Sequence, residues 1–279
     1  FIWCIQINDV GFLKGGSITA PTEGSKYLYI ANNTTPMYCT VSLIDGSLSL
    51  CQNTGNGITQ ALGVTAYKNY VYFVNRSGHE VYKCFVSSNG ALINCAANYT
   101  NPTFINDPKT LTVHNGYLYI GNFSTRLIVV CSISSTGDLT NCTQTASSNI
   151  VYNTFSIRAN NSYFYMGYFS NQYISVCEIG SDGSLNSCTN NNLNNNYPYG
   201  LAFYGNYFYD VNPYSNNIQA CSTFNAGVPS GCSLLTNALM TNPIDLAINK
   251  GTAYILNNYG VSIVTCSISN AILSNCSIA

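Results

Sequence analysis

The chain has 279 residues, only 7% of which are charged, and its formal net charge is −1. Without a basic run it lacks the electrostatic surface that binds phosphate backbones or anionic membranes, so we expect no nucleic-acid partner. No apolar stretch reaches the roughly 18 residues that a membrane-spanning helix needs, so the sequence predicts no membrane span. No charged leader precedes Phe1, which indicates that any targeting peptide has been removed.

The first sixteen residues look like half of the unit that repeats through the rest of the chain. An apolar stretch, Phe1–Ile7, contains Cys4 and the only tryptophan, Trp3, but Gly16 stands where a second cysteine is expected. In one interpretation this stretch is an extra edge strand against the last unit, and Cys4 is buried there. In the other it adds to the sheet of a neighbouring molecule, where Cys4 forms an intermolecular disulfide. Such a contact propagates into a filament unless the rotation closes.

The remainder of the chain, residues 17–279, repeats a pattern every 44 to 47 residues. In the clearest copy, four stretches with a period of two are expected to be strands. They are Leu111–Val113, Tyr117–Ile120, Ile128–Ile133 and Asp138–Cys142. Four short antiparallel strands per repeat, repeated about six times, are typical of a β-propeller. We therefore predict an all-β propeller of four-stranded blades over residues 17–279, with six blades, or seven if the half repeat 1–16 counts as one.

Twelve of the thirteen cysteines form pairs whose members are 10 to 12 positions apart. The pairs are Cys39/Cys51, Cys84/Cys95, Cys131/Cys142, Cys177/Cys188, Cys221/Cys232 and Cys266/Cys276. No C-x-x-C knuckle occurs, and neither His79 nor His114 has a cysteine at a zinc-binding spacing, so we expect no metal and no cofactor. The regular pairing predicts one disulfide per blade and an oxidising location, extracellular or at the cell surface. Each pair flanks a turn, so we expect its members to lie opposite each other on adjacent strands, with Cα atoms about 5.5 Å apart.

The second predicted strand of each repeat carries a recognisable motif. Five copies read Tyr29–Asn32, Tyr72–Asn75, Tyr119–Asn122, Tyr209–Asn212 and Tyr254–Asn257. They resemble the Y-V-T-N element of the YVTN-type β-propeller repeat proteins of microbial cell surfaces. The fourth repeat departs from the motif with Tyr165–Tyr168, and the cysteine pairs are an addition to it. The resemblance implies a propeller fold and an extracellular setting, but no activity.

The predicted innermost strands supply the candidate ligand-binding residues. Their middle positions are small and uncharged, namely Ser17, Gly63, Thr112, Ser156, Ala202 and Ala247. We expect these residues to meet at a narrow channel that has no ring of acids. Further along the strands we expect one polar ring, formed by Thr19, Thr65, His114, Arg158, Tyr204 and Asn249. Such a ring could hold a sugar or an anion; alternatively, these residues are the solvated ends of the strands.

Catalytic and glycosylation motifs complete the survey of candidate residues. Asp45, Asp138 and Asp182 fall in turns, His79–Glu80 in a polar loop, and no nucleophile elbow or P-loop occurs, so we expect no enzyme. Eight asparagines lie in N-x-S/T sequons and are candidate glycan acceptors. They are Asn32, Asn33, Asn75, Asn98, Asn122, Asn141, Asn160 and Asn275.

The function that these features favour is a non-catalytic, secreted or cell-surface structural propeller that self-associates into an extracellular filament or layer. Low charge supports close packing of like subunits, because few charges need to be desolvated. The alternative is a carbohydrate-binding or adhesive module that recognises glycans. A lactonase-like hydrolase on the same scaffold comes third.

Overall fold

The computed structural model describes residues 17–19, 27–31, 35–54, 57–125, 127–146, 153–160, 162–168, 172–193, 197–258 and 262–279. The half repeat 1–16, with Cys4 and Trp3, and the sequons at Asn32 and Asn33 lie outside these residues. For Ser17–Thr19 the description covers the backbone.

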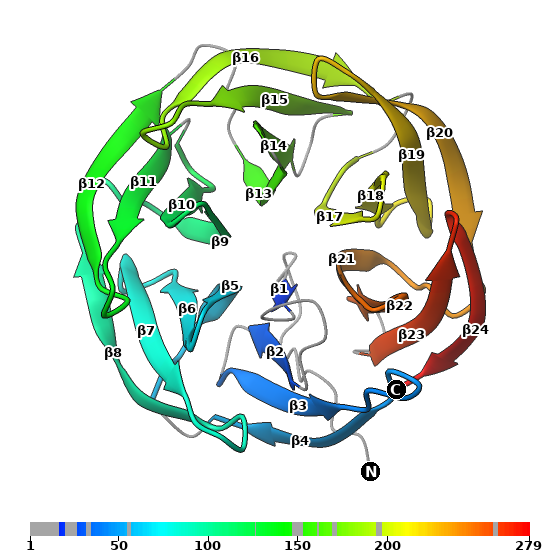
Figure 1. Ribbon diagram of the computed structural model, residues 1–279, viewed down its shortest axis with the longest axis horizontal. Coiled ribbons are helices and arrows are strands. Elements are labelled where there is room, and N and C mark those ends of the chain that lie inside the picture. Colours follow the sequence, from blue (N-terminus) through cyan, green and yellow to red (C-terminus); the bar gives the residue numbers. More distant parts are fainter. Residues whose placement is uncertain are drawn as a thin grey trace.

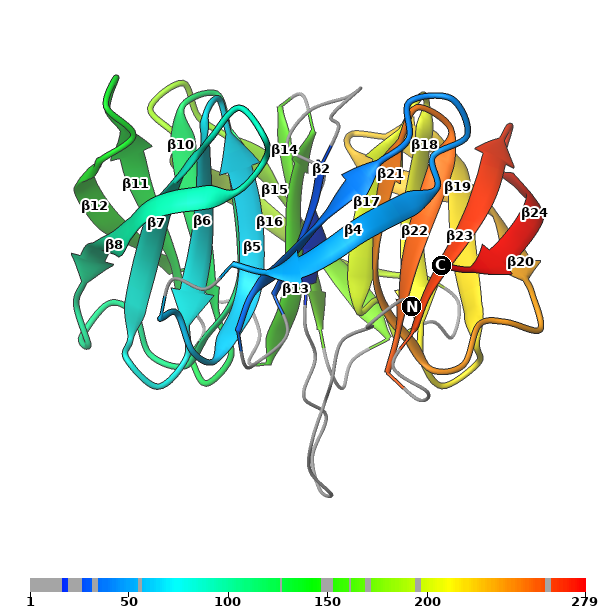
Figure 2. The same ribbon diagram turned by 90° about the horizontal axis from the view of Figure 1, so that it is seen from below.

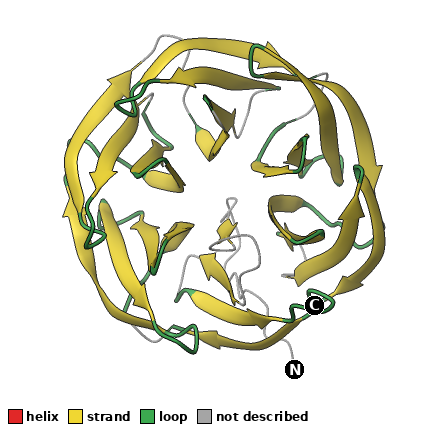
Figure 3. Cartoon of the chain, viewed as in Figure 1, coloured by secondary structure: helices red, strands yellow, loops and turns green. Residues whose placement is uncertain are grey.

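The chain forms six four-stranded antiparallel sheets arranged as blades around a central axis (Figure 1; strands are yellow in Figure 3). In every blade the strands follow chain order from the axis to the rim. Seen from the side, the blades make a disc whose two faces carry the connections between strands (Figure 2). The predicted six-bladed propeller is confirmed, and the seven-bladed alternative is wrong. No helix among the described residues has the length and hydrophobicity needed to cross a bilayer.

The strands of blades 1 to 3 are β1 (Ser17–Thr19), β2 (Tyr27–Ala31), β3 (Met37–Val41), β4 (Leu48–Asn53), β5 (Ala61–Tyr67), β6 (Tyr70–Asn75), β7 (Glu80–Val86), β8 (Leu92–Thr100), β9 (Pro108–His114), β10 (Tyr117–Asn122), β11 (Leu127–Ile133) and β12 (Leu139–Ala146). The strands of blades 4 to 6 are β13 (Thr154–Asn160), β14 (Tyr163–Tyr168), β15 (Tyr173–Ile179), β16 (Leu185–Asn192), β17 (Gly200–Tyr204), β18 (Tyr207–Asn212), β19 (Asn217–Asn225), β20 (Val228–Thr236), β21 (Pro243–Asn249), β22 (Thr252–Asn257), β23 (Ser262–Ser269) and β24 (Ile272–Ile278).

The hydrophobic core lies between neighbouring blades. The second strands are buried on both faces; in β10, for instance, every residue after Tyr117 is buried. Leu118 and Ile120 of blade 3 share a cluster with Tyr72 and Val74 of blade 2. The outer strands β4, β8 and β24 are mostly exposed. Burial therefore falls from the axis to the rim, and each blade depends on both neighbours for its core.

One disulfide per blade links the third and fourth strands, in the six predicted pairs. The bridges are Cys39–Cys51, Cys84–Cys95, Cys131–Cys142, Cys177–Cys188, Cys221–Cys232 and Cys266–Cys276. Their Cα atoms are 3.9 to 4.1 Å apart, so the predicted separation of about 5.5 Å is wrong. The first cysteine of every pair is buried. Of the second cysteines only Cys188 is buried. The others are partly buried or exposed, and these are Cys51, Cys95, Cys142, Cys232 and Cys276.

The prediction that the two cysteines of a pair lie directly opposite each other holds only in blade 5, where Cys221 pairs with Cys232. In the other five blades the register shifts by one residue at the first cysteine, as in a β-bulge, so that two residues face one. The second cysteines in these bulges are Cys51, Cys95, Cys142, Cys188 and Cys276. The residue before each of them has a positive φ, at Leu50, Asn94, Asn141, Ser187 and Asn275.

In five of the six blades, a tyrosine of the second strand fastens its blade to the next one. At five junctions the second tyrosine of the Y-x-Y pattern, whose first tyrosine is replaced by Thr252 in blade 6, donates its hydroxyl to the carbonyl of the glycine in the next blade's outer hairpin. These bonds are Tyr29 to Gly90 (2.9 Å), Tyr72 to Gly137 (2.7 Å), Tyr119 to Gly183 (3.0 Å), Tyr165 to Gly227 (2.9 Å) and Tyr254 to Gly46 (2.8 Å). We call this set the tyrosine belt. The bond from Tyr254 joins the last blade to the first.

The hairpin glycines of the belt have two physical reasons to be glycine. Gly137 has a φ of 78°, where side chains are strained. A Cβ there would also come within 2.7 Å of the Tyr70 ring, which lies against the hairpin. A Cβ on Gly90 would likewise come too close to the Tyr27 ring, and a Cβ on Gly183 would come too close to the Tyr117 ring. These glycines therefore serve the junctions between blades as well as the turns.

Candidate functional site

Charged side chains gather where the innermost strands begin, near the axis. Lys109 is the second residue of β9, and Asp245 is the third residue of β21. Both line a cavity with Phe155, Ser156 and other residues at the start of the inner strands. The cavity has a volume of about 10 Å³, which is room for about one water molecule.

The charges of this axial cluster are held by specific partners. Arg76 forms a two-pronged ion pair with Asp107, in which Nη2 donates to Oδ2 at 2.9 Å. Ser124 donates to the same carboxylate oxygen at 2.6 Å. Across the axis, Arg158 Nη2 lies 3.4 Å from Asp245 Oδ1. The Arg158 side chain also donates to its own backbone neighbour, the carbonyl of Ile157, at 2.8 Å.

Lys109 is the most perturbed cation of the cluster. Its Nζ lies 4.5 Å from the centroid of the Phe155 ring, and only 6% of the residue is exposed. Burial, and secondarily the charge of Arg76, lower the pKa of Lys109 to about 7, against the opposing influence of Asp107 and Asp245. The sequence analysis did not single out Lys109, because a lysine at the start of an inner strand has the pattern of a solvated strand end.

The polar ring predicted from the sequence is not a single ring, because its members stand at two levels. Three of them pair with the second tyrosine of their own blades, namely Thr19, Thr65 and Arg158. The other three pair with the residue two positions before that tyrosine, next to the turn that connects the first and second strands. They are His114, Tyr204 and Asn249. The predicted register was wrong because the inner strands carry no cysteine or tyrosine that fixes their alignment.

The predicted row of small residues divides in the same way. Thr112, Ala202 and Ala247 pair with the second tyrosine. Ser17, Gly63 and Ser156 pair two residues further along the second strand. At this second level the other blades contribute Thr110, Gly200 and Asp245. The expectation of uniformly uncharged inner positions is therefore wrong, and Asp245 is the acid that the misaligned register concealed.

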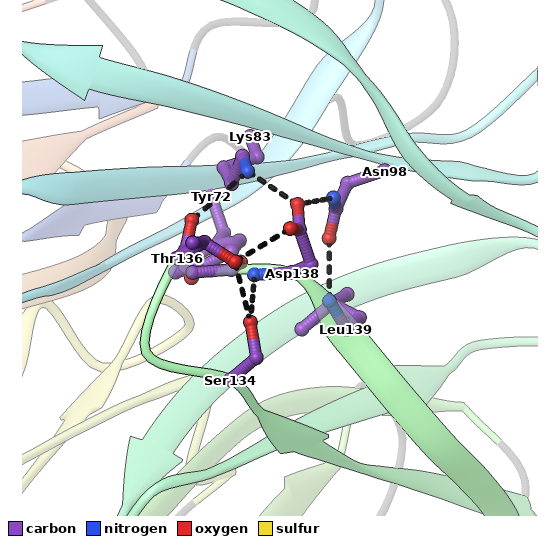
Figure 4. Close-up of polar contacts among 8 residues, drawn as sticks. Tyr72, Lys83, Asn98, Ser134, Thr136, Asp138 and Leu139 are labelled. Carbon is purple, nitrogen blue, oxygen red and sulfur yellow. Dashed lines mark hydrogen bonds and ion pairs between the residues drawn. The ribbon is translucent and has the colours of Figure 1, made fainter.

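The predicted turn acids do form turns, and one of them also joins two blades. Asp138 Oδ1 contacts Lys83 Nζ at 2.5 Å and accepts from Asn98 Nδ2 at 3.0 Å, and both partners lie on blade 2 (Figure 4). Asn98 Oδ1 in turn accepts from the Leu139 backbone at 2.8 Å. These bonds, led by the contact with Lys83, lower the pKa of Asp138. Figure 4 shows this network beside the tyrosine-belt bond of Tyr72, so the junction between blades 2 and 3 is fastened twice.

The other residues predicted to lie in turns and loops are His79, Asp45 and Asp182. His79 has a φ of 51°, and its Nδ1 lies 3.0 Å from the Ile105 carbonyl, so its ring ties the loop before β7 to the following blade. Asp45 and Asp182 accept hydrogen bonds from residues two positions ahead, as expected of turn residues.

The sequons differ in how accessible their side-chain amides are. Asn122 is fully buried, and its Nδ2 donates to the carbonyls of Phe104 (2.9 Å) and Leu127 (3.3 Å). Asn75 is 8% exposed, and Asn98 is held in the network of Figure 4. A glycan on Asn122 would break both bonds. The exposed sequons are those of Asn141 and Asn275, which occupy the bulges beside the disulfides.

A surface pocket of about 640 Å³ lies between blades 4 and 5, away from the axis. Tyr163 and Phe203 line it together with Phe224, which is 39% exposed. The polar residues include Asn160 and Asn206. We call this the aromatic pocket. Sequence analysis missed it because Phe224 lies on the extended hairpin arm of β19, where the repeat pattern gives no anchor.

Comparisons with known proteins relate the chain to other propellers by shape alone. No family model matches the chain, and no curated protein matches it. Among solved structures, the nidogen/laminin complex contains a chain with a TM-score of 0.70 and 10% identity, over 90% of this chain and 92% of that one. The periplasmic gluconolactonase PpgL of Pseudomonas aeruginosa gives 0.64 and 12%, over 94% and 84%. A functionally unknown protein from Desulfotomaculum acetoxidans gives 0.63 and 14%, over 93% and 87%.

Proposed function

We propose that this chain is a non-catalytic, extracellular structural propeller whose copies associate through their outer strands. The observation that carries the proposal is the composition of the rim. None of the six outer strands, β4, β8, β12, β16, β20 and β24, contains Asp, Glu, Lys or Arg. Edge strands of proteins that stay apart usually carry charges that block pairing with another molecule.

Exposed apolar side chains reinforce this rim. Leu50, Leu234, Ile272 and Ile278 are each more than half exposed, and Ile93 is 40% exposed. All five lie on outer strands. An outer strand presents a row of backbone groups that have no partner within its own sheet, so a second copy can extend the sheet by pairing along it. The disulfide that joins each outer strand to its neighbour would keep that edge in place.

The comparisons are consistent with a binding or structural role and with a hydrolytic one. A laminin complex and a gluconolactonase occur among the similar structures, at identities that carry the fold alone. Six disulfides favour an oxidising, extracellular setting.

Negative-stain electron microscopy of the purified chain tests the proposal. We expect regular filaments or layers, in which neighbouring discs meet at their rims. Non-reducing gels test the separate role predicted for Cys4, and a ladder that Cys4→Ser abolishes would place a disulfide between copies. Discs that remain single at every concentration would refute the assembly proposal.

A second candidate function, carbohydrate binding, is favoured by the aromatic pocket. Its volume is in the range of small-ligand sites, and its lining combines aromatic rings with amides and no charged side chain. Neutral sugars present both C–H faces and hydroxyl groups, which rings and amides can bind.

An array of neutral glycans tests the second candidate. Binding should fall at least tenfold with Phe224→Ala and should not change with Phe85→Ala, an aromatic of similar exposure on blade 2. Equal binding by both variants would exclude the aromatic pocket as the site.

A further inference from the structure

One position of the repeat is apolar in five blades and acidic in the sixth. It directly follows the second tyrosine of the second strand. The apolar residues are Ile30, Phe73, Ile120, Met166 and Ile255, and the acid is Asp210 of β18. Each pairs with an apolar residue of the inner strand, which for Asp210 is Leu201. An apolar side chain therefore fits this place, and the carboxyl group of Asp210 requires an explanation.

Asp210 is fully buried at the junction of blades 4 and 5. Leu201, its pairing partner, packs in one cluster with Tyr165 and Ile174 of blade 4. Neither carboxyl oxygen of Asp210 has a hydrogen-bond partner among the described residues. Burial raises the pKa of this carboxyl well above its usual value, and no neighbouring charge opposes the effect. A lone carboxylate in such surroundings is costly unless something compensates its charge.

Two amide oxygens on the same face of blade 5 are also buried without a hydrogen-bond partner among the described residues. Gln219 is the cross-strand neighbour of Asp210 and is 5% exposed. Its Nε2 donates to the Leu193 carbonyl at 3.3 Å, but its Oε1 accepts no hydrogen bond from the described residues. Asn217, two residues earlier on β19 and so on the same face, is 6% exposed, and its Oδ1 is equally without a donor. Four buried acceptor atoms from three side chains thus lie on one face of two paired strands.

Protonation of Asp210 would not give every one of these buried acceptor atoms a hydrogen-bond donor. It would supply one donor, which could satisfy one of the two amide oxygens and leave the other buried without a partner. A cation satisfies all the acceptors at once, because carboxylate and amide oxygens are ligands of hard metal ions. We propose that Asp210, Gln219 and Asn217 bind a sodium ion between blades 4 and 5.

Charge balance selects a monovalent ion. One carboxylate facing one Na⁺ leaves the buried site neutral. A divalent ion would leave one uncompensated positive charge in the same apolar junction, which is costly away from water. Calcium sites instead gather several carboxylates, and Asp210 is the only acid on this face of β18 and β19.

Differential scanning calorimetry tests the site in the intact protein. The chain is dialysed into choline chloride and then melted in choline, sodium, potassium or calcium chloride at one ionic strength. An ion that binds only the folded state raises the Tm in a saturable way, here by about 3 °C at saturation. Asp210→Leu should fold, because other blades carry an apolar residue there, and its Tm should be the same in sodium and choline.

A matched control and a second variant sharpen the result. Asp245→Asn removes another buried carboxylate, one that pairs with Arg158, and should keep the full sodium response. Gln219→Leu should reduce that response by more than half. A wild-type Tm that is the same in sodium and choline would overturn the proposal, as would a response to calcium alone. A sodium response that survives Asp210→Leu or is unchanged by Gln219→Leu would also overturn it.

Discussion

At the scale of single residues, the sparse charges of this protein matter more than their number suggests. Lys109 and Asp245 are buried at the axis, where the low polarity of the interior strengthens both their attraction and the cost of leaving either one alone. Arg158 and Arg76 lie in the same region, each against a carboxylate. The axial cluster therefore ties inner strands of different blades together, and its titration should be visible in the stability of the whole ring.

Stability should rise with pH between about 7 and 9.5 because of Lys109. Its pKa is about 7 in the folded chain and about 10.4 when unfolded, so in this window the unfolded chain binds more protons and is disfavoured as pH rises. Lys109→Met should remove this slope, which amounts to roughly 3 kcal/mol over the window. Denaturant unfolding at several pH values measures it, with the exposed Lys250→Met as the control. An identical slope in wild type and Lys109→Met would contradict this assignment.

Above pH 10 the buried tyrosines should make the stability fall as pH rises, because burial raises the pKa of Tyr209 and Tyr254 to about 12 in the folded chain.

At the scale of elements, the unit of stability is the junction between an outer hairpin and the preceding blade. The hairpin supplies a glycine carbonyl, and the neighbouring strand supplies two tyrosines, one to donate and one to pack. The disulfide then holds the outer strand of that hairpin to the rest of its blade. Each element is thereby fixed on two sides by residues that recur once per repeat.

Gly137→Ala should destabilise the protein by more than its backbone strain alone. An alanine at this positive φ costs about 1 kcal/mol of stability. Its Cβ would also displace Tyr70 and weaken the hydrogen bond from Tyr72, which should cost about 1 to 2 kcal/mol more. Gly57→Ala is the control, because Gly57 has a similar φ of 70° but no atom within 4 Å of the added Cβ. Equal losses in a denaturant titration would mean that the tyrosine contact contributes nothing.

Removal of one disulfide should loosen one rim strand. Cys131→Ser with Cys142→Ser opens a loop of 11 residues and should cost about 3 kcal/mol. Hydrogen exchange should quicken in β12 and stay unchanged in β4, which lies in another blade of the ring. If exchange quickened equally in all outer strands, the blades would not be stapled independently.

The sequence predicted the elements of this fold far better than their alignment. Cysteines mark the outer strands and tyrosines mark the second strands, so blade number, strand number and disulfide pairing followed from their period. The inner strands have no such marker, and small residues alternate there, which is why the prediction put Arg158 and His114 on one level. The bulges were not foreseen because Leu50 and Ser187 adopt a positive φ without being glycine. Asp210 was concealed within the Y-x-x-N motif, whose flanking residues match while its interior differs.

At the scale of the whole molecule, the ring of described strands closes between two blades that are each continuous in sequence. Blade 1 is built from β1–β4 and blade 6 from β21–β24, so both are complete in sequence. They are joined by the bond from Tyr254 to Gly46 and by a cluster in which Leu28 and Met37 share contacts with Leu246 and Ile255.

Loss of the hydrogen bond from Tyr254 to Gly46 should loosen only the two blades that it joins. Tyr254→Phe should cost about 1 kcal/mol, as Tyr119→Phe should, because each removes one hydrogen bond to a backbone carbonyl. Faster hydrogen exchange should appear in blades 1 and 6 for the first variant and in blades 3 and 4 for the second. Exchange that quickens in the same blades for both variants would contradict a belt of separate junctions.

Sedimentation velocity over a range of concentrations tests the central claim, that copies associate through uncharged outer strands. The wild-type chain should form larger species as its concentration rises. A variant with Leu234→Lys and Ile278→Lys, which adds charge to β20 and β24, should stay monomeric. Ile44→Lys, in a fully exposed turn, should associate like wild type. A wild-type chain that sediments as a monomer at every concentration, or a rim variant that associates as wild type does, would contradict the account.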